Sequence, residues 1–357
     1  MNKINKAKIV YLGYNHMYKH KRGVENVIEF QSKASLSIFN YYIHWDDETK
    51  AYRYENLICI GIKKNIFCFL RLNIILHKIK RRDRAIFIHS HNPLMSIMSF
   101  YRSNLFTIHD ALYYLTSATK HKLNKVFYLL EKILYLRTNF VHFISNYAKK
   151  MSLFTGNENC IIIPNTSHLE AFITNNNHKM NAIKRFAKEV TKVFIVRSIE
   201  ERALINLIIE VADKLKTENF EFLIAGKGPL LVFYRDKIKE LGLENITLLG
   251  YVSDDDLIQY YQDCDLVLVS AAYGEGFGLP IIEGYLHKKP VIASNVCAIP
   301  EVIISNNFLF ENTVDSIISK LYFAKEQKEY QYRNYYDERF SNTVIISKMN
   351  ELYKKLL

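Results

Sequence analysis

The 357-residue chain is poor in glycine, proline and cysteine, with 12, 6 and 5 residues respectively. The low glycine and proline contents exclude collagen-like and low-complexity chains, and 49% hydrophobic residues exclude an intrinsically disordered one. The cysteines are odd in number, scattered and without a CxxC pair, so we expect neither a disulfide framework nor a zinc knuckle. Reduced thiols of this kind are typical of cytoplasmic proteins, and the length suggests two domains.

Long hydrophobic runs are also missing. No apolar run approaches the ~20 residues of a membrane-spanning helix, and residues 1–14 lack the features of a secretory signal. Residues 1–185 hold 28 Lys and Arg against 11 Asp and Glu, whereas residues 186–357 hold 20 against 25, which gives the net charge of +12. The basic half predicts a polyanionic partner: lipid headgroups, a phosphorylated substrate or nucleic acid. No nucleic-acid-binding motif is present, so we expect no nucleic acid partner.

Both halves alternate short β-branched runs with longer helical patterns, which is typical of doubly wound α/β sheets. The expected strands are 8–13, 57–61, 85–89, 105–109, 141–145 and 160–164 in the first half, and 192–197, 221–226, 246–250, 265–270 and 290–294 in the second. We expect a first domain over residues 1–170, a linker over 171–190 with an asparagine run, and a second domain over 191–339.

Two segments of the first half combine apolar and basic residues: 65–84, NIFCFLRLNIILHKIKRRDR, and 122–137, KLNKVFYLLEKILYLR. A helix with a basic face and a Phe/Leu/Ile face is suited to a membrane interface. The alternative is an ordinary surface helix that packs on the sheet and turns its charges to water. Segment 65–84 is the stronger candidate for membrane contact because it ends in a dense basic cluster.

A glycine-rich turn, GEGFGLP over residues 274–280, follows the expected strand 265–270. Its glycines, among them Gly276, allow close approach of a ligand and positive φ, and Pro280 suits the first turn of a helix. An anion can then bind to the backbone N–H groups of Phe277, Gly278 and Leu279. Glu275 lies on the turn, and Glu283 lies about one turn into the helix that follows. Two carboxylates beside a phosphate-sized anion site fit a nucleotide sugar, because they can accept hydrogen bonds from its sugar and ribose hydroxyls.

On these residues the sequence resembles the retaining glycosyltransferases of family 4, whose Glu-x7-Glu hallmark is met by Glu275 and Glu283. The resemblance runs from about Val193 to Val302 and more loosely through the first half. It implies an α/β protein of the GT-B fold, with two doubly wound Rossmann-like domains facing across a cleft. The first domain would bind the acceptor, the second the nucleotide sugar, and residues 340–357 would cross back to the first. By the family's pattern, Glu275 would contact the transferred sugar and Glu283 would contact the ribose of the nucleotide.

The resemblance also assigns two regions of the second domain to the donor diphosphate and nucleotide. Arg197 matches the arginine of the family's Gly-Arg…Lys-Gly pattern, whereas Arg202 stands where lysine is usual and both glycines are replaced. A guanidinium still offers bidentate donors to phosphate; the alternative for Arg202 is a solvated helix residue. Gly226 and Lys227 resemble the nucleotide-side loop, although a plain chain reversal would look the same.

In the first half, His109 matches the strand-end histidine that the family places against the donor sugar, with a structural histidine as the alternative. His91 belongs to a loop that resembles the family's earlier histidine-containing loop. Gly23 resembles part of the family's Gly-Gly loop and would approach the transferred group, while Arg22 could meet an acceptor phosphate. No role is assigned to the residues after Asn165.

The resulting hypothesis is transfer of a hexose or N-acetylhexosamine from a nucleoside diphosphate sugar, with a UDP-sugar favoured and the anomeric configuration retained. No metal cofactor is expected: the sequence DCD over residues 263–265 precedes its strand, whereas a metal-binding Asp-x-Asp follows one. Basic charge and family habit suggest a polyprenyl-diphosphate-linked saccharide of O-antigen, lipopolysaccharide or capsule synthesis as acceptor. The enzyme would then lie peripherally at the inner face of the cell membrane. Alternatives are a GT-B nucleotide-sugar epimerase and a non-catalytic, basic, membrane-binding protein.

Overall fold

The computed structural model describes residues 8–19, 23–34, 39–109, 124–175, 190–327 and 330–357. The chain forms two compact units: the first contains residues up to Asn165 together with Asn342–Leu357, and the second spans Thr166–Ser341. The passage between them thus falls five residues before the sequence-based boundary at residue 170. Most of the expected linker, residues 176–189, lies outside the described residues.

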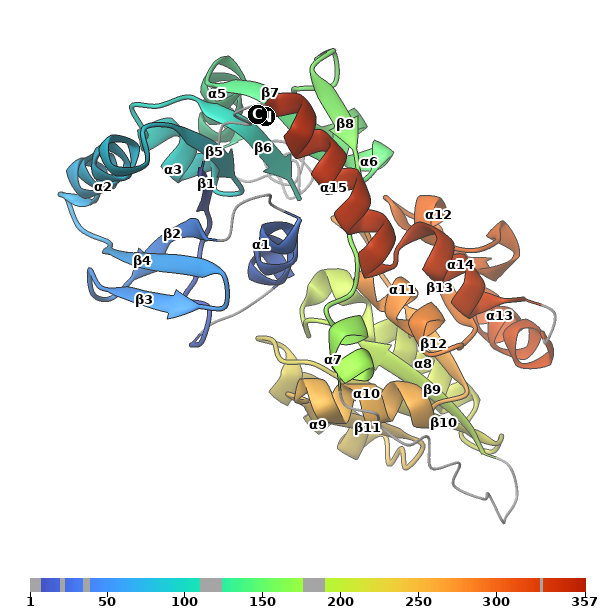
Figure 1. Ribbon diagram of the computed structural model, residues 1–357. Coiled ribbons are helices and arrows are strands. Elements are labelled where there is room, and N and C mark those ends of the chain that lie inside the picture. The colour runs from blue at the N-terminus through green and yellow to red at the C-terminus, as the bar shows by residue number, and fades with distance from the viewer. Residues whose placement is uncertain (1–7, 20–22, 35–38, 110–123, 176–189, 328–329) are drawn as a thin grey trace. The chain divides into compact units, whose positions relative to one another are not determined.

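The first unit is built on an eight-stranded sheet in the order β3-β4-β2-β1-β5-β6-β7-β8 (Figure 1). All its strand pairs are parallel except β3 with β4. The strands are β1 (Lys8–Leu12), β2 (Asn40–Asp46), β3 (Ala51–Tyr54), β4 (Leu57–Lys63), β5 (Ile86–Ser90), β6 (Ser103–Ile108), β7 (Thr138–Phe143) and β8 (Cys160–Ile162). Its helices are α1 (Gly23–Lys33), α2 (Cys68–Asp83), α3 (Pro93–Met98), α5 (Asn124–Leu136), α6 (Asn146–Met151) and α15 (Asn342–Leu356).

The second unit has a fully parallel six-stranded sheet in the order β11-β10-β9-β12-β13-β14. Its strands are β9 (Thr191–Val196), β10 (Phe220–Ala225), β11 (Ile246–Gly250), β12 (Leu266–Val269), β13 (Val291–Ser294) and β14 (Leu309–Phe310). Its α-helices are α7 (Leu169–Asn175), α8 (Ile205–Lys214), α9 (Leu231–Glu240), α10 (Asp254–Asp263), α11 (Leu279–Leu286), α12 (Ile299–Val302), α13 (Val314–Glu326) and α14 (Tyr332–Arg339). Short 3₁₀ turns cover Glu201–Ala203 and Asn306–Phe308. The predicted α/β class with two doubly wound sheets is confirmed.

Both sheets reverse their strand order at one point, which lies between β1 and β5 in the first unit and between β9 and β12 in the second. Loops leave the sheet in opposite directions at such a point, and open α/β sheets bind ligands in the crevice that results. We therefore expect ligand-binding residues directly after β1, β5, β9 and β12.

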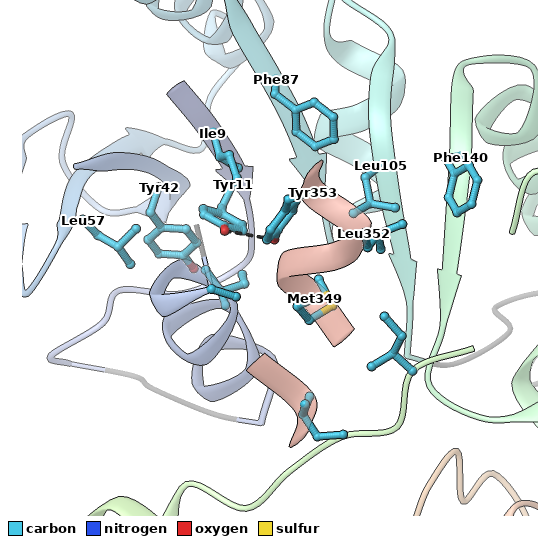
Figure 2. Packing of buried hydrophobic residues seen from close by; sticks show 14 of the residues in the cluster. Ile9, Tyr11, Tyr42, Leu57, Phe87, Leu105, Phe140, Met349, Leu352 and Tyr353 are labelled. Carbon is cyan, nitrogen blue, oxygen red and sulfur yellow. Dashed lines mark hydrogen bonds between the residues drawn. The ribbon is translucent and has the colours of Figure 1, made fainter. Parts of the chain in front are cut away.

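Helix α15 completes the core of the first unit although it follows the second unit in the chain. Its residues Ile345, Met349, Leu352 and Tyr353 are buried in a cluster with Ile9, Tyr11, Phe87 and Leu105 (Figure 2). The Tyr353 and Tyr11 hydroxyl groups lie 3.0 Å apart and form a hydrogen bond inside this cluster. Full burial of four apolar side chains ties the helix firmly to the sheet.

Candidate active site

The second unit brings two predicted residues together at the reversal point of its sheet. Arg197 directly follows β9, and Glu275 lies in the turn after β12. The Arg197 guanidinium donates through Nη1 to Glu275 Oε2, and the two side chains are only 9% and 16% exposed. A nearly buried, hydrogen-bonded ion pair fixes both side chains much more tightly than a surface pair would.

Arg202 braces the same turn from the other side. It lies in the 3₁₀ turn Glu201–Ala203, donates through Nη1 to the carbonyl oxygen of Gly274 at 2.8 Å, and donates through Nε to Glu200 Oε1 at 2.9 Å. Its own carbonyl oxygen accepts from the Ala272 N–H at 2.9 Å. Arg202 therefore contacts the residue before Glu275 rather than extending into solvent as an isolated helix residue.

The Gly226 loop packs directly on the segment that carries Arg197. Gly226 has φ +152°, and a Cβ atom at this position would lie 1.7 Å from the carbonyl oxygen of Arg197. At Gly228 the same test places a Cβ atom 2.1 Å from the Ile199 carbonyl oxygen. The Lys227 side chain lies over the Tyr251 ring, with Nζ 4.5 Å from the ring centroid. Both glycines are required by close backbone approach, which a plain chain reversal would not demand.

The glycine turn after β12 is anchored through its aromatic residue. The Phe277 side chain is buried and packs edge-on against Phe340, at 5.9 Å between ring centroids. Gly278 precedes α11 with φ +92°, a conformation that favours glycine, and a proline stands in the first helical turn. Gly276 and Leu279 complete the turn. The N-terminus of α11 is therefore held by the core while its backbone stays near Glu275.

Glu283 is the second predicted carboxylate, and it is buried on α11. Its Oε2 accepts from the Tyr261 hydroxyl at 2.8 Å and its Oε1 accepts from Ser167 Oγ at 3.3 Å. Burial raises the pKa of Glu283, while the nearby His168 lowers it to a smaller extent. Sequence analysis identified neither Ser167 nor Tyr261 as a partner of Glu283. Ser167 lies two residues after Asn165, and this position was its only signal in the sequence. Tyr261 had none.

In the first unit, the predicted histidines meet after β5 and β6. His91 Nδ1 and His109 Nε2 lie 2.9 Å apart, and the rings stack at 5.2 Å between centroids. Burial lowers the pKa of His109 to about 3 and the pKa of His91 well below its ordinary value. His91 Nε2 is buried and has no hydrogen-bond partner among the described residues. A cavity of about 230 Å³ adjoins both rings, and Tyr14, Thr107, Glu131 and Phe154 also line it.

A buried chain of hydrogen bonds behind this pair fixes the tautomers of two further histidines. His142 Nε2 lies 2.8 Å from the Ile163 carbonyl oxygen, so it must carry the proton. His142 Nδ1 then accepts from Thr107 at 2.9 Å, and Thr107 accepts from His89 Nε2 at 2.7 Å. His89 Nδ1 in turn accepts from the Tyr353 hydroxyl at 2.8 Å. The strand ends that carry His91 and His109 are thus held by neutral rings.

The remaining predicted residues fall into two groups. Gly23 begins α1 and is exposed, with no atom within 4 Å of a Cβ built on it, so packing does not require glycine there. Arg22 lies outside the described residues, as do residues 122 and 123 of the second apolar and basic segment. Within the described ranges, no group of three or more His, Cys, Asp or Glu residues is arranged to hold a metal ion.

Segment 65–84 forms α2 and the turn before it, and it leaves large apolar side chains exposed. Ile66 is 87% exposed, and Phe67, Leu70 and Ile74 are each more than half exposed. The C-terminal part of the helix carries Lys80, Arg81 and Arg82 in its last turn. We call residues Ile66, Phe67, Leu70 and Ile74 the α2 apolar surface. No helix within the described ranges combines the length and apolarity needed to cross a bilayer.

The chain is similar in sequence to known glycosyltransferases and to a protein of a cps region. Residues 176–339 match the family of glycosyl transferases described as group 1. A Klebsiella pneumoniae protein of 41.2 kDa in the cps region, which is uncharacterized, is 27% identical over 251 residues, or 66% of this chain and 67% of that protein. The O-antigen chain mannosyltransferase B of Escherichia coli is 41% identical over 73 residues, which cover 20% of this chain and 19% of that enzyme.

Solved structures support the fold over the whole length of the chain. The crystal structure of HepE from Anabaena, determined in complex with UDP and glucose, superposes with a TM-score of 0.73 at 15% identity. The alignment covers 98% of this chain and 99% of that one. At this level of identity the likeness establishes the architecture alone. The roles of individual side chains follow from their own contacts and chemistry.

Proposed function

Because the chain has the GT-B fold and carries a group 1 glycosyltransferase domain over residues 176–339, we propose that it transfers a sugar from a nucleoside diphosphate sugar with retention of configuration. The transferred group is a hexose or N-acetylhexosamine, and the donor favoured is a UDP-sugar. The acceptor is a saccharide linked to polyprenyl diphosphate in the synthesis of O-antigen, lipopolysaccharide or capsule. The observation that carries the proposal is the partly buried Arg197–Glu275 pair at the reversal point of the second sheet.

The chemistry that this proposal requires is the stabilisation of negative charge on a leaving diphosphate. The bond from the anomeric carbon to the diphosphate breaks while the acceptor hydroxyl oxygen bonds to that carbon on the same face. The acceptor's proton passes to an oxygen of the departing phosphate, so no protein nucleophile is needed. Arg197, Arg202 and the backbone N–H groups at the start of α11 are the described donors near the turn.

Each carboxylate in this scheme holds hydroxyl groups rather than attacking the sugar. Glu275 is held in place by Arg197, so that it can accept hydrogen bonds from hydroxyls of the transferred sugar. Glu283 is oriented by Tyr261 and Ser167 and would accept from the ribose. His109, in the first unit, is neutral near pH 7 because burial lowers its pKa to about 3, and a neutral ring can exchange hydrogen bonds with a sugar without adding charge.

Relatives support the class of sugar and the kind of pathway. One is named as a mannosyltransferase that acts on O-antigen chains, one is encoded in a cps region, and HepE was crystallised with UDP and glucose. These names favour a hexose, and they support a place in surface polysaccharide synthesis. The names do not agree on a single hexose, since one gives mannose and another glucose, so the donor panel includes both UDP- and GDP-hexoses.

The α2 apolar surface supports a location at the membrane. Four large apolar side chains are exposed on α2 and the turn before it, and the same helix ends in a basic last turn, so this segment is suited to insertion between anionic lipid headgroups. Since a polyprenyl-linked acceptor is embedded in the bilayer, an enzyme held at the surface gains access to it. We propose that the first unit lies peripherally on the inner face of the cell membrane through this surface.

The test is a donor screen with purified protein. UDP-glucose, UDP-galactose, UDP-N-acetylglucosamine and GDP-mannose are each offered with bacterial membranes or a synthetic prenyl-diphosphate-linked N-acetylglucosamine, with and without EDTA. We expect transfer from one donor, unchanged by EDTA, with an axial or equatorial bond matching the donor's. Glu275→Gln and Glu283→Gln are expected to reduce transfer at least 100-fold, whereas Glu326→Gln on the exposed face of α13 retains it. Equal activity of Glu275→Gln and the parent protein would contradict the proposal.

A further inference from the structure

A second cavity lies in the first unit, at the carboxyl ends of β1, β2 and β4. It measures about 420 Å³, which is within the usual range for small-molecule sites. Its lining includes the indole ring of Trp45 and the cationic side chains of Lys63 and Lys64. Asn15, His16 and Asp47 add groups that can donate or accept hydrogen bonds. The donor chemistry proposed above uses none of these residues.

One wall of this cavity is the loop after β1, and a buried carboxylate holds it in place. Glu25 on α1 is fully buried, and its Oε1 accepts from the N–H groups of Tyr14 at 3.3 Å and Asn15 at 3.0 Å. Its Oε2 accepts from Asn15 Nδ2 at 3.2 Å. The Tyr42 hydroxyl donates to the Asn15 carbonyl oxygen at 2.8 Å. Burying a carboxylate is costly unless its partners are fixed, so a loop that receives one is a preformed wall rather than a loose connection.

A second set of partly buried contacts holds two further lining residues, His16 and Trp45. The Tyr52 hydroxyl accepts from the Met17 N–H at 2.9 Å and lies 3.0 Å from His44 Nε2. His44 Nδ1 lies 2.8 Å from the Trp45 carbonyl oxygen and therefore donates to it. Burial lowers the pKa of His44 to about 4, so the ring is neutral near pH 7 and this arrangement persists. The His16 ring stacks on Tyr52 at 4.0 Å between centroids.

The chemistry of the lining points to a sugar that carries a phosphate. Trp45 offers an aromatic face for the apolar side of a pyranose ring, and the carboxylates of Asp46 and Asp47 can accept from its hydroxyls. Lys64 Nζ lies over the Trp45 ring, 6.0 Å from its centroid, so a cation stands close to the indole. Lys63 lines the same side of the cavity. A neutral sugar would need no lysine, and a bare phosphate would need neither the carboxylates nor the indole.

The chain itself continues from these lysines to the α2 apolar surface. Ile66 follows Lys64 by two residues, a reach of at most about 7 Å along the backbone. A ligand with a sugar, then a phosphate, then a lipid would therefore find matching groups in that order. We propose that this cavity binds the saccharide of the lipid-linked acceptor, that Lys63 and Lys64 bind its phosphate, and that the lipid leaves over the α2 apolar surface. This inference rests on the proposed function, whose acceptor it places.

The single tryptophan of the chain makes a direct binding test possible, because Trp45 alone reports from the cavity wall. The probes are prenyl-diphosphate-linked N-acetylglucosamine in detergent, N-acetylglucosamine 1-phosphate, inorganic diphosphate and UDP. We expect a saturable change of fluorescence with the first two probes, tighter for the lipid-linked one, and none with UDP. A change with UDP, or no saturable change with either sugar phosphate up to millimolar concentration, would overturn the proposal.

Variants then connect the signal to the lining. Asp47→Asn and Lys64→Gln are expected to weaken the binding of both sugar phosphates about tenfold or more, while the neighbouring Glu48→Gln, which is exposed and does not line the cavity, leaves it unchanged. Affinities of Asp47→Asn and Lys64→Gln within twofold of the parent protein would also overturn the site. Hydrolysis of the nucleotide sugar, measured without acceptor, separates the two hypotheses. If the parent protein neither hydrolyses nor transfers any donor but its Trp45 fluorescence still responds to the sugar phosphates, the proposed function is refuted and the sugar phosphate site stands. If it transfers sugar but Trp45 fluorescence does not respond, the site alone is refuted.

Discussion

Acidification from pH 7 to pH 5 is expected to destabilise the first unit because it buries histidines in the neutral form. Burial is the largest cause of the shift at each of them. It lowers the pKa to about 4 for His44 and His142, to about 3 for His109, and well below the ordinary value for His89 and His91. The second unit contributes His287, whose pKa burial lowers to about 4. The first unit therefore carries most of the acid sensitivity that these shifts predict.

The sign follows from proton counting. Between the unfolded pKa of about 6.5 and the lowered folded values, the unfolded chain binds more protons, so stability falls as the pH falls. Each histidine that stays neutral removes about 2 kcal/mol of unfolding free energy between pH 7 and pH 5. His44 and His142 donate to different backbone carbonyl oxygens, those of Trp45 and Ile163, so their contributions are independent. Together they remove about 4 kcal/mol, against a typical total of about 5–15 kcal/mol for a domain.

Urea unfolding at the two pH values measures this loss, with Trp45 fluorescence reporting on the first unit and far-UV circular dichroism on both. With a slope of about 2 kcal/mol per molar urea, the Trp45 midpoint should fall by roughly 2 M at pH 5. The second unit, followed as the remaining change in circular dichroism, should shift by less. A Trp45 midpoint that is equal at pH 7 and pH 5 would refute the argument that these rings are buried and neutral.

Three further predictions follow from single contacts. Gly226→Ala places a Cβ atom 1.7 Å from the Arg197 carbonyl oxygen and should abolish nucleotide binding measured by calorimetry. The control is Gly242→Ala, which is also at positive φ but has no atom within 4 Å of the added Cβ, and this variant should bind the nucleotide normally. Tyr353→Phe leaves His89 Nδ1 without its buried donor and should lower the unfolding free energy of the first unit by about 1–3 kcal/mol in the same urea titration. Tyr322 is 41% exposed, so the control variant Tyr322→Phe should change stability by less than about 0.5 kcal/mol. Ile66→Asp should reduce binding to anionic phosphatidylglycerol vesicles at least tenfold in sedimentation assays, and undiminished binding would argue against the α2 apolar surface as the membrane contact.

The strands that sequence analysis predicted are those whose apolar residues run together. Residues 266–269 and 291–294 are short, fully buried and β-branched or leucine-rich, and both were expected. Strand β2, Asn40–Asp46, was missed because its sequence, NYYIHWD, contains aromatic and polar residues that do not form such a run. It is central and buried nonetheless, because its polar groups find partners elsewhere: Asn40 accepts from the Ile9 N–H at 3.2 Å, for example.

The candidate site shows the same division. Spacing along the chain was enough to single out Glu275 and Glu283, because the turn and the helix that carry them are local features. The partners of these carboxylates are 78 residues away for Glu275 and 116 residues away for the bond from Ser167 to Glu283. Such pairings depend on how strands and loops assemble, and no local pattern encodes them. The buried role of Glu25 is equally invisible, since a glutamate in an amphipathic helix normally faces water.

Helix α15 gives the protein an order of events during synthesis. The first unit lacks Met349, Leu352 and Tyr353 from its core until the ribosome has translated the whole of Thr166–Ser341. At about 5–20 residues per second, that interval lasts roughly 10–35 s. The nascent first sheet spends this time with an open apolar groove where α15 later packs, while the second unit, which is continuous in sequence, can complete its fold. Chaperone capture should therefore concentrate on the first 165 residues, and nascent chains arrested before residue 342 should be the most sensitive to proteolysis there.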